Sequence, residues 1–423
     1  MKSVLFFLLA LCFLSGFVFA DEGETEEKED TYIEKNVQTI SDFRFVGLKK
    51  TQTRYLKRVL KDFVGKEITE ESKKEIENAL QQLQLFEEIS LSSDSGENGV
   101  VEIVLKEKIS FLPVPIVASS NGSFMAGAFV MDTNALGEQD AFMLGGLWST
   151  SSLLGMASFS VQAKDFSHPG FSLSASAIKG KSKIDDEKRE RLFEYERKGF
   201  NFGVAVTEKI NKYLSLGAGV GYSYLNVDES GEYEPIGLDR MQKISPTLSL
   251  ALGKSDWNGV FISSQSLGLS GGMIFGDYYG EKNTAKSVSA KIAFQQPIID
   301  TLRVIVGLSG VYGVDEDITN FSGEGSAGVT ILADDFCSEK IGGGSAGLEW
   351  AFAQGKYATF SAYGLYEAAA FTNFADEKCF EQGFEVGMKS YLKKIAFPAL
   401  AFGLSYNATE KFWNYSFAFG AQF

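Results

Sequence analysis

Few side chains in this sequence could carry covalent or acid–base chemistry. The chain of 423 residues has one histidine, His168, within Asp165-Phe166-Ser167-His168-Pro169-Gly170. A serine hydrolase needs a base oriented beside its nucleophile, and the side chains of adjacent residues such as Ser167 and His168 diverge. The sequence also lacks a phosphate loop, a dinucleotide-binding motif and paired metal-ligand motifs. We therefore expect no enzymatic activity, no cofactor and no metal.

Composition narrows the class of protein. The chain has 40 Lys and Arg against 55 Asp and Glu, a net charge of -15, and an acidic chain lacks the basic surface that a nucleic-acid partner requires. It contains 44 Gly, 36 Phe and only 7 Pro. Many short strands with glycine and aromatic residues are typical of an all-β barrel or sandwich.

The final segment, 412–423, alternates between two kinds of side chain. Every second position is apolar, and these residues are Trp413, Tyr415, Phe417, Phe419, Ala421 and Phe423. The intervening residues are small or polar. Because a strand places successive side chains on opposite faces, one face suits lipid and the other a hydrated lumen, as in a transmembrane β-barrel. A strand of a soluble sandwich, covered by a second sheet, is the alternative, but the pattern recurs in 400–406 and favours a barrel.

The chain before the barrel divides into three parts. Lys2, the apolar run 4–19 and the small residue Ala20 predict a signal peptide over 1–20. The acidic segment 21–36 lacks apolar residues to bury, so we expect it to be disordered. Residues 37–109 predict a small α+β module of order β-α-α-β-β, in which Thr69 caps the second helix and 96–99 form a hairpin loop.

Residues 110–423 predict an antiparallel transmembrane barrel of about sixteen strands, each of about 9–11 residues. The connections alternate in length. Short ones fall at 210–212, 300–301 and 354–356, and long charged ones at 181–191, 226–242, 276–286 and 314–344. Short turns at one end and long loops at the other are the rule for such barrels.

Several motifs resemble a known family. The module, with Phe45-Val46-Gly47-Leu48 and Leu85-Phe86-Glu87-Glu88-Ile89, resembles a POTRA domain. Three barrel segments, taken in order, resemble the BamA/TamA superfamily of bacterial surface antigens: Asp132–Gly137, Ser255–Phe261 and Gly347-Leu348-Glu349-Trp350. In that family Glu349 would be the inward glutamate of the twelfth strand. The resemblance implies a barrel in the bacterial outer membrane with its POTRA-like domain in the periplasm.

The family's strongest motif, Val-Arg-Gly-Phe/Tyr in the sixth outer loop, is altered here. The corresponding segment is Leu332-Ala333-Asp334-Asp335-Phe336-Cys337, which keeps the aromatic residue as Phe336 but has Asp334 and Asp335 and no arginine. The family's partner in the thirteenth strand would be Glu367, and acid facing acid repels. We therefore expect the loop to stay outside or to be held differently. A disulfide between Cys337 and Cys379 could replace the ion pair; free thiols in an unanchored loop are the alternative.

The first and last barrel strands suggest a mechanism. Pro113 and Pro115 in the first strand cannot donate ladder hydrogen bonds, so its seam with 413–423 could be weak and could open to template an incoming strand. Both prolines could instead precede the paired part of the strand.

The resemblance implies a role in inserting, assembling or translocating other outer-membrane proteins, with the lipid bilayer, unfolded clients and accessory periplasmic proteins or lipoproteins as partners. A structural or binding barrel without insertase activity is one alternative, since the loop arginine is missing. A two-partner secretion transporter is another, although two POTRA-like modules and a plug helix would then be expected.

Overall fold

The structure, a computed structural model, describes residues 38–91, 99–120, 123–163, 168–228, 240–258, 261–278, 281–392 and 398–419. The predicted signal peptide, the acidic lead, most of the 96–99 hairpin loop, Ser167 and Phe423 lie outside these residues.

The N-terminal module has the predicted order of elements. Its helical segments are α2 (Thr53–Val59), the 3-10 turn η1 (Lys61–Phe63) and α3 (Glu70–Gln82), and its strands are β1 (Asp42–Val46), β2 (Phe86–Leu91) and β3 (Val100–Glu107). The strand order is β1-β3-β2, with β1 parallel and β2 antiparallel to β3. Thr69 caps α3 as predicted: its hydroxyl accepts from the Ser72 amide at 3.0 Å, and the Ser72 hydroxyl accepts from the Thr69 amide at 2.9 Å. The helices cover the sheet through a core that includes Leu56, Leu60, Ile76, Leu80 and Ile103.

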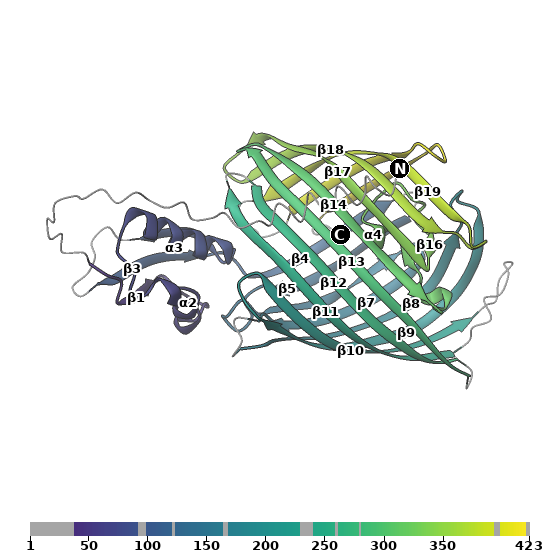
Figure 1. Ribbon diagram of the computed structural model, residues 1–423, viewed down its shortest axis with the longest axis horizontal. Coiled ribbons are helices and arrows are strands. Elements are labelled where there is room, and N and C mark those ends of the chain that lie inside the picture. The colour runs from purple at the N-terminus through teal and green to yellow at the C-terminus, as the bar shows by residue number, and fades with distance from the viewer. Residues whose placement is uncertain are drawn as a thin grey trace, which may run out of the picture. The chain divides into compact units, whose positions relative to one another are not determined.

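The rest of the described chain forms a closed antiparallel barrel of sixteen strands (Figure 1), as predicted. In chain order the strands are β4 (Phe111–Ser120), β5 (Ser123–Asp132), β6 (Ala141–Ser149), β7 (Ser152–Val161), β8 (Gly170–Asp185), β9 (Arg191–Lys209), β10 (Leu214–Asp228), β11 (Arg240–Asn258), β12 (Phe261–Tyr278), β13 (Glu281–Ile299), β14 (Leu302–Val314), β17 (Lys340–Gln354), β18 (Ala358–Thr372), β19 (Lys378–Leu392), β20 (Pro398–Asn407) and β21 (Phe412–Phe419). The barrel closes where β21 pairs with β4.

The outer face of the barrel is apolar. Large side chains at alternate strand positions point away from the lumen and are exposed: Leu248 is 70% exposed, Trp413 58% and Trp350 54%. Their neighbours in sequence face the lumen and are mostly small or polar. Closure pairs the strands side to side, so the apolar face meets lipid rather than a second sheet, and the fold is a transmembrane β-barrel. No helix in the described ranges is long and apolar enough to cross a membrane.

The prediction of long loops at 181–191 and 276–286 is wrong. β8 continues to Asp185 and β9 starts at Arg191, so most of 181–191 is strand; likewise β12 ends at Tyr278 and β13 starts at Glu281. Polar and charged residues predict a loop when only the sequence is considered. The backbone pairing nevertheless continues beyond the lipid, where ion pairs such as Lys181 to Glu194, at 3.1 Å, join neighbouring strands. Strands β8 to β13 therefore have 15 to 19 residues rather than the expected 9–11.

Most of the predicted long loop 226–242 lies outside the described residues. The connection after β14 is long, as predicted. Residues 315–339 join β14 to β17, and we call them the sixth loop. They contain η2 (Ile318–Asn320), β15 (Ser322–Gly323), the short helix α4 (Glu324–Ala327) and β16 (Cys337–Ser338). We call the barrel end that carries this loop and the β8–β9 connection (186–190) the loop end, and the opposite end, with the β5–β6 connection (133–140), the turn end.

Candidate functional site: the sixth loop and the β21–β4 seam

The sixth loop lies inside the barrel. Apolar side chains of the loop pack against inward-facing residues of β17 and β18. The loop contributes Ala327, Val329, Ile331, Leu332, Ala333 and Phe336, and the wall contributes Ile341, Ala369 and Phe371. The rings of Phe336 and Phe371 lie 4.5 Å apart between centroids. The retained aromatic residue at Phe336 thus anchors the loop by packing.

Polar side chains of the barrel wall bind the backbone of the same segment. Glu367, 1% exposed, accepts hydrogen bonds from the Thr330 amide at 2.8 Å and from the Thr330 hydroxyl at 3.2 Å. The carbonyl of Thr330 accepts from Ser405 at 2.8 Å and from Asn414 at 2.7 Å. Asn414 also donates to the Leu332 carbonyl at 2.7 Å, and Asn407 to the Ile331 carbonyl at 3.0 Å.

Of the two predicted alternatives, the loop is therefore held differently rather than left outside. Glu367 faces the loop, as the resemblance implied, but it meets an amide and a hydroxyl of Thr330 instead of an arginine. Asp335 points elsewhere and pairs with Arg191 of β9 at 3.2 Å. The backbone amide and the hydroxyl of Thr330 thus take the place of the missing cation.

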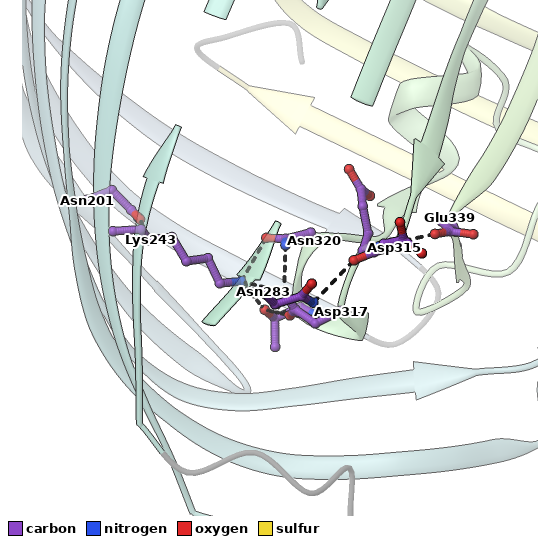
Figure 2. Close-up of polar contacts among 10 residues, drawn as sticks. Asn201, Lys243, Asn283, Asp315, Asp317, Asn320 and Glu339 are labelled. Atoms are coloured by element: carbon purple, nitrogen blue, oxygen red, sulfur yellow. Dashed lines mark hydrogen bonds and ion pairs between the residues drawn. The ribbon is translucent and has the colours of Figure 1, made fainter. Parts of the chain in front are cut away.

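The same loop is fixed to the opposite wall. Lys243 of β11, 6% exposed, reaches from the wall into the loop, as Figure 2 shows, and its ammonium group donates to Thr319 at 2.6 Å, Asn320 at 2.8 Å and both carboxylate oxygens of Asp317 at 3.1 and 3.2 Å. Nearby, Ile318 and Cys337 pack on a second apolar cluster of the wall, which consists of Ile184, Tyr195, Val227 and Met241. The sixth loop thus spans the lumen from β11 to β18–β21.

The proposed disulfide is absent. Cys337 and Cys379 are both free thiols. Cys337 packs toward the cluster on β8 to β11, whereas Cys379 lies on β19 opposite Phe371 of β18 and packs with the other cluster. The two side chains therefore pack with different clusters. Burial raises the pKa of Cys337 in the loop to about 12, which keeps it in the unreactive thiol form.

Glu349 is the centre of a buried network in the wall. It is fully buried, and one of its oxygens accepts from Arg303 of β14, with the shorter contact at 2.7 Å. The other oxygen accepts from Ser361 at 2.6 Å and from Tyr391 at 2.7 Å. Sequence reasoning identified Glu349 but missed Arg303. The available signal was an arginine at an inward position of the apolar strand Leu302–Val314.

The described part of the β21–β4 seam is short. Among the described residues, Ser416–Phe419 of β21 pair with Val117–Ser120 of β4, whereas all of β4 pairs with β5. Pro113 and Pro115 lie opposite Val130 and Ala128 of β5 and precede the paired part of the seam. The alternative interpretation of the prolines thus fits the described pairing, and the weakness of the seam lies in its length.

The outward residues predicted for the seam lie on the lipid-facing side. Trp413 is 58% exposed and Tyr415 41%, and both lie beyond the end of β4. Phe417 and Phe419, each 38% exposed, belong to the paired segment.

An arginine from another part of the chain covers the unpaired part of β21. Arg189, in the β8–β9 connection, donates to the Trp413 carbonyl at 3.3 Å and to the Asn414 side chain, and its guanidinium lies 3.9 Å from the centroid of the Phe412 ring. Asp185, at the base of this connection, donates its amide to the Asp335 carbonyl at 3.1 Å. The β8–β9 connection and the sixth loop therefore hold β21 together. No sequence pattern singled out Arg189.

At the turn end, the module is hydrogen-bonded to the β5–β6 connection. Arg54 donates to Glu138 at 2.7 Å, Tyr55 to Gln139 at 2.7 Å and Asn134 to Thr51 at 3.0 Å. Burial raises the pKa of Tyr55, so its hydroxyl stays a donor. Gly137 has φ +85°, and a Cβ there would lie 2.3 Å from a module carbonyl oxygen, which explains the glycine in this connection.

The remaining candidates for chemistry are the single histidine and possible metal ligands. His168 is exposed in the β7–β8 connection. Among the described residues, no group of three or more His, Cys, Asp or Glu side chains is placed to hold a metal ion.

Comparison with known proteins shows similarity at the level of the fold. No family model and no curated protein matches the sequence. Among solved structures, BamA from Haemophilus ducreyi lacking POTRA domains 1–3 aligns over 91% of this chain and 84% of its own, with a TM-score of 0.54 and 15% identity. CdiB from Escherichia coli aligns over 90% and 76%, with a TM-score of 0.60 and 16% identity. CdiB from Acinetobacter baumannii aligns over 90% of this chain and 73% of its own, with a TM-score of 0.57 and 12% identity. The chain thus has the fold that BamA and CdiB share.

Proposed function

We propose that this protein is an outer-membrane barrel of the BamA/TamA superfamily that assists the insertion or translocation of other outer-membrane proteins. In this proposal the β21–β4 seam opens, and its exposed edges template an incoming strand by β-augmentation. The N-terminal module is a periplasmic POTRA-like domain that receives clients or accessory proteins. The protein performs no enzymatic reaction and uses no cofactor.

The observation that carries this proposal is the short seam. Opening it breaks only the pairing of Ser416–Phe419 with Val117–Ser120 among the described residues, while every other pair of neighbouring strands has a longer ladder. A backbone edge in the bilayer must find partners, so an open seam would favour pairing with a client strand. The similarity to BamA supports the same interpretation.

One alternative is a structural or binding barrel of the same fold. The sixth loop favours it, because Lys243 and Glu367 fix that loop to opposite walls and Arg189 covers the edge of β21. A two-partner secretion transporter is the second alternative, favoured by the similarity to CdiB; it would serve a single secreted partner, whereas the insertase would serve many barrels.

A reversible cross-link of the seam tests the proposal. Ala118 and Ala418 lie opposite each other across it, so cysteines at both positions satisfy disulfide geometry. The native Cys337 and Cys379 are replaced by serine. We expect oxidation of the A118C/A418C variant to lower the levels of folded outer-membrane proteins in cells depleted of the native protein, and a reductant to restore them.

The matched control keeps one cysteine and moves the other. Ala401 of β20 also lies opposite Ala418, so A401C/A418C cross-links β21 on its other side and leaves the seam free to open. Normal levels of other barrels with the seam fully cross-linked would exclude the insertase and favour the structural barrel. Loss of one secreted protein alone would favour the two-partner transporter. Membrane fractionation tests the proposed location in the outer membrane.

A further inference from the structure

A row of donor side chains crosses the outer face of four neighbouring strands near the loop end. Lys179 of β8 lies opposite Lys198 of β9, Lys198 opposite Asn226 of β10, and Asn226 opposite Arg240 of β11. We call these four residues the basic row. Lys179, Lys198 and Arg240 are exposed. Four side chains of the same strands are buried against the sixth loop and therefore point inward: Ile184, Tyr195, Val227 and Met241. The residues of the basic row occupy the alternate positions of these strands, so they point outward.

Among the described residues, the charges of the basic row have no ion-pair partner. Lys179 and Lys198 face each other directly, at a Cβ separation of about 5 Å, and like charges in this arrangement are destabilising. No ion pair joins Lys179, Lys198 or Arg240 to any residue that the structure describes. In a chain with a net charge of -15, a row of three cations and one amide is unexpected.

The neighbouring outward lysines differ in this respect. Lys181 lies opposite Glu196 and 3.1 Å from Glu194, Lys183 lies opposite Glu194, and Lys282 lies opposite Asp277. Each of them has an acidic neighbour across the ladder. These three compensated lysines therefore serve as a reference for the basic row.

The basic row lies at the edge of the lipid-facing band. One step toward the turn end on the same strands, Phe200 and Tyr224 stack with ring centroids 5.6 Å apart. Beyond them the outward side chains are apolar and exposed, as Phe202, Ile244 and Leu248 show. Aromatic residues mark the boundary between hydrocarbon and headgroups in membrane barrels, so the basic row lies at headgroup level.

We propose that the basic row binds the phosphate of an anionic lipid in the leaflet at the loop end. All four side chains offer hydrogen-bond donors, and the guanidinium of Arg240 can bind two phosphate oxygens at once. The phosphate would lie over the strands and relieve the repulsion between Lys179 and Lys198. This inference depends on the transmembrane fold and not on the proposed insertion role.

The test compares lipid binding by two variants of the full chain, purified in a neutral detergent. K179Q/K198Q/R240Q removes the charge of the basic row. K181Q/K183Q/K282Q removes the same charge from the compensated lysines and is the matched control. Binding of phosphatidic acid and of phosphatidylcholine is measured for both by native mass spectrometry, with inorganic phosphate as a competitor. The mobility shift of heated against unheated protein on a gel confirms that each barrel is folded.

We expect the native chain and the control to bind phosphatidic acid in preference to phosphatidylcholine, and K179Q/K198Q/R240Q to lose that preference. Each Lys or Arg near a charged membrane surface contributes about fivefold in affinity, so three give on the order of a hundredfold. The charge-preserving variant K179R/K198R should bind like the native chain. Equal losses in both glutamine variants would overturn the proposal. So would equal binding of the two lipids by the native chain, or release of phosphatidic acid by inorganic phosphate at similar concentrations.

Discussion

Glu367→Ala should release the sixth loop from the barrel wall. The carboxylate of Glu367 is buried and accepts two hydrogen bonds from Thr330. A hydrogen bond contributes about 0.5–1.5 kcal/mol net, and a buried amide left without an acceptor costs about 1–3 kcal/mol. Since apolar packing of Phe336 and its neighbours persists, we expect a loss of about 3 kcal/mol in loop docking. The open population should then rise on the order of a hundredfold.

Amide hydrogen exchange measures this opening directly. The amides of 329–336 should exchange on the order of a hundredfold faster in Glu367→Ala than in the native chain. Glu367→Gln keeps an acceptor oxygen, so its increase should be less than about tenfold. Glu349→Gln disturbs a network that lies wholly in the wall and serves as the control. Unchanged exchange of 329–336 in Glu367→Ala, or an equal increase in Glu349→Gln, would show that packing alone holds the loop.

Three further predictions follow from the loops and the module. Arg189→Ala should expose the edge of β21, so amides of 412–415 should exchange severalfold faster while the β20 ladder is unaffected; no change would mean that Arg189 does not protect the edge. Glu138→Ala removes the partner of Arg54 and Arg58 and should destabilise the attachment of the module by about 1–3 kcal/mol, seen in calorimetry as a separate, earlier unfolding transition; a single unshifted transition would contradict this. Burial, with Glu339 nearby, raises the pKa of Glu316 in the sixth loop from its ordinary 4.5 to about 7. The docked loop therefore binds the proton more tightly than the open loop, and docking should be strongest below about pH 4.5 and weaken as pH rises through about 7. Exchange across the sixth loop should follow that pH dependence in the native chain and lose it in Glu316→Gln.

The barrel was predictable because its signal repeats. Alternating apolar and small residues in segments such as 400–406 and 412–423 fix which face meets lipid, and a slip of one residue would reverse every side chain. The ends of the strands were less predictable. Around Lys181 and Glu194 the outward face becomes polar once it leaves the lipid, so the sequence resembles a loop although the backbone stays paired.

The site was only partly predictable. Glu349 and Glu367 stood out because the resemblance to the BamA/TamA superfamily places an acid at each of these positions. Their partners did not stand out: Thr330 binds Glu367 through its backbone amide as well as its hydroxyl, and every residue except proline has such an amide. Lys243 and Arg189 join segments far apart in the chain, and no local pattern records which loop folds over which strand. The predicted disulfide failed for the same reason, since no local pattern records that the two thiols pack with different clusters.

The arrangement of these contacts determines which side of the seam should move. β21 is tied to the sixth loop by the two hydrogen bonds that Asn414 donates to it, and Arg189 holds β21 to the β8–β9 connection. No hydrogen bond joins β4 to the sixth loop among the described residues. Opening the seam therefore costs β4 only its short ladder with β21, whereas moving β21 would also break its contacts in the lumen.

We therefore expect β4 to move away, together with β5, while β21 stays with the sixth loop. Spin labels on Ser119 and Ser326 should separate when the seam opens, and labels on Phe417 and Ser326 should keep their distance. Cross-linking the A118C/A418C pair should abolish the first change. Separation of the second pair without the first would mean that β21 leaves the loop, and the contacts of Asn414 and Arg189 would then be too weak to decide the direction of opening.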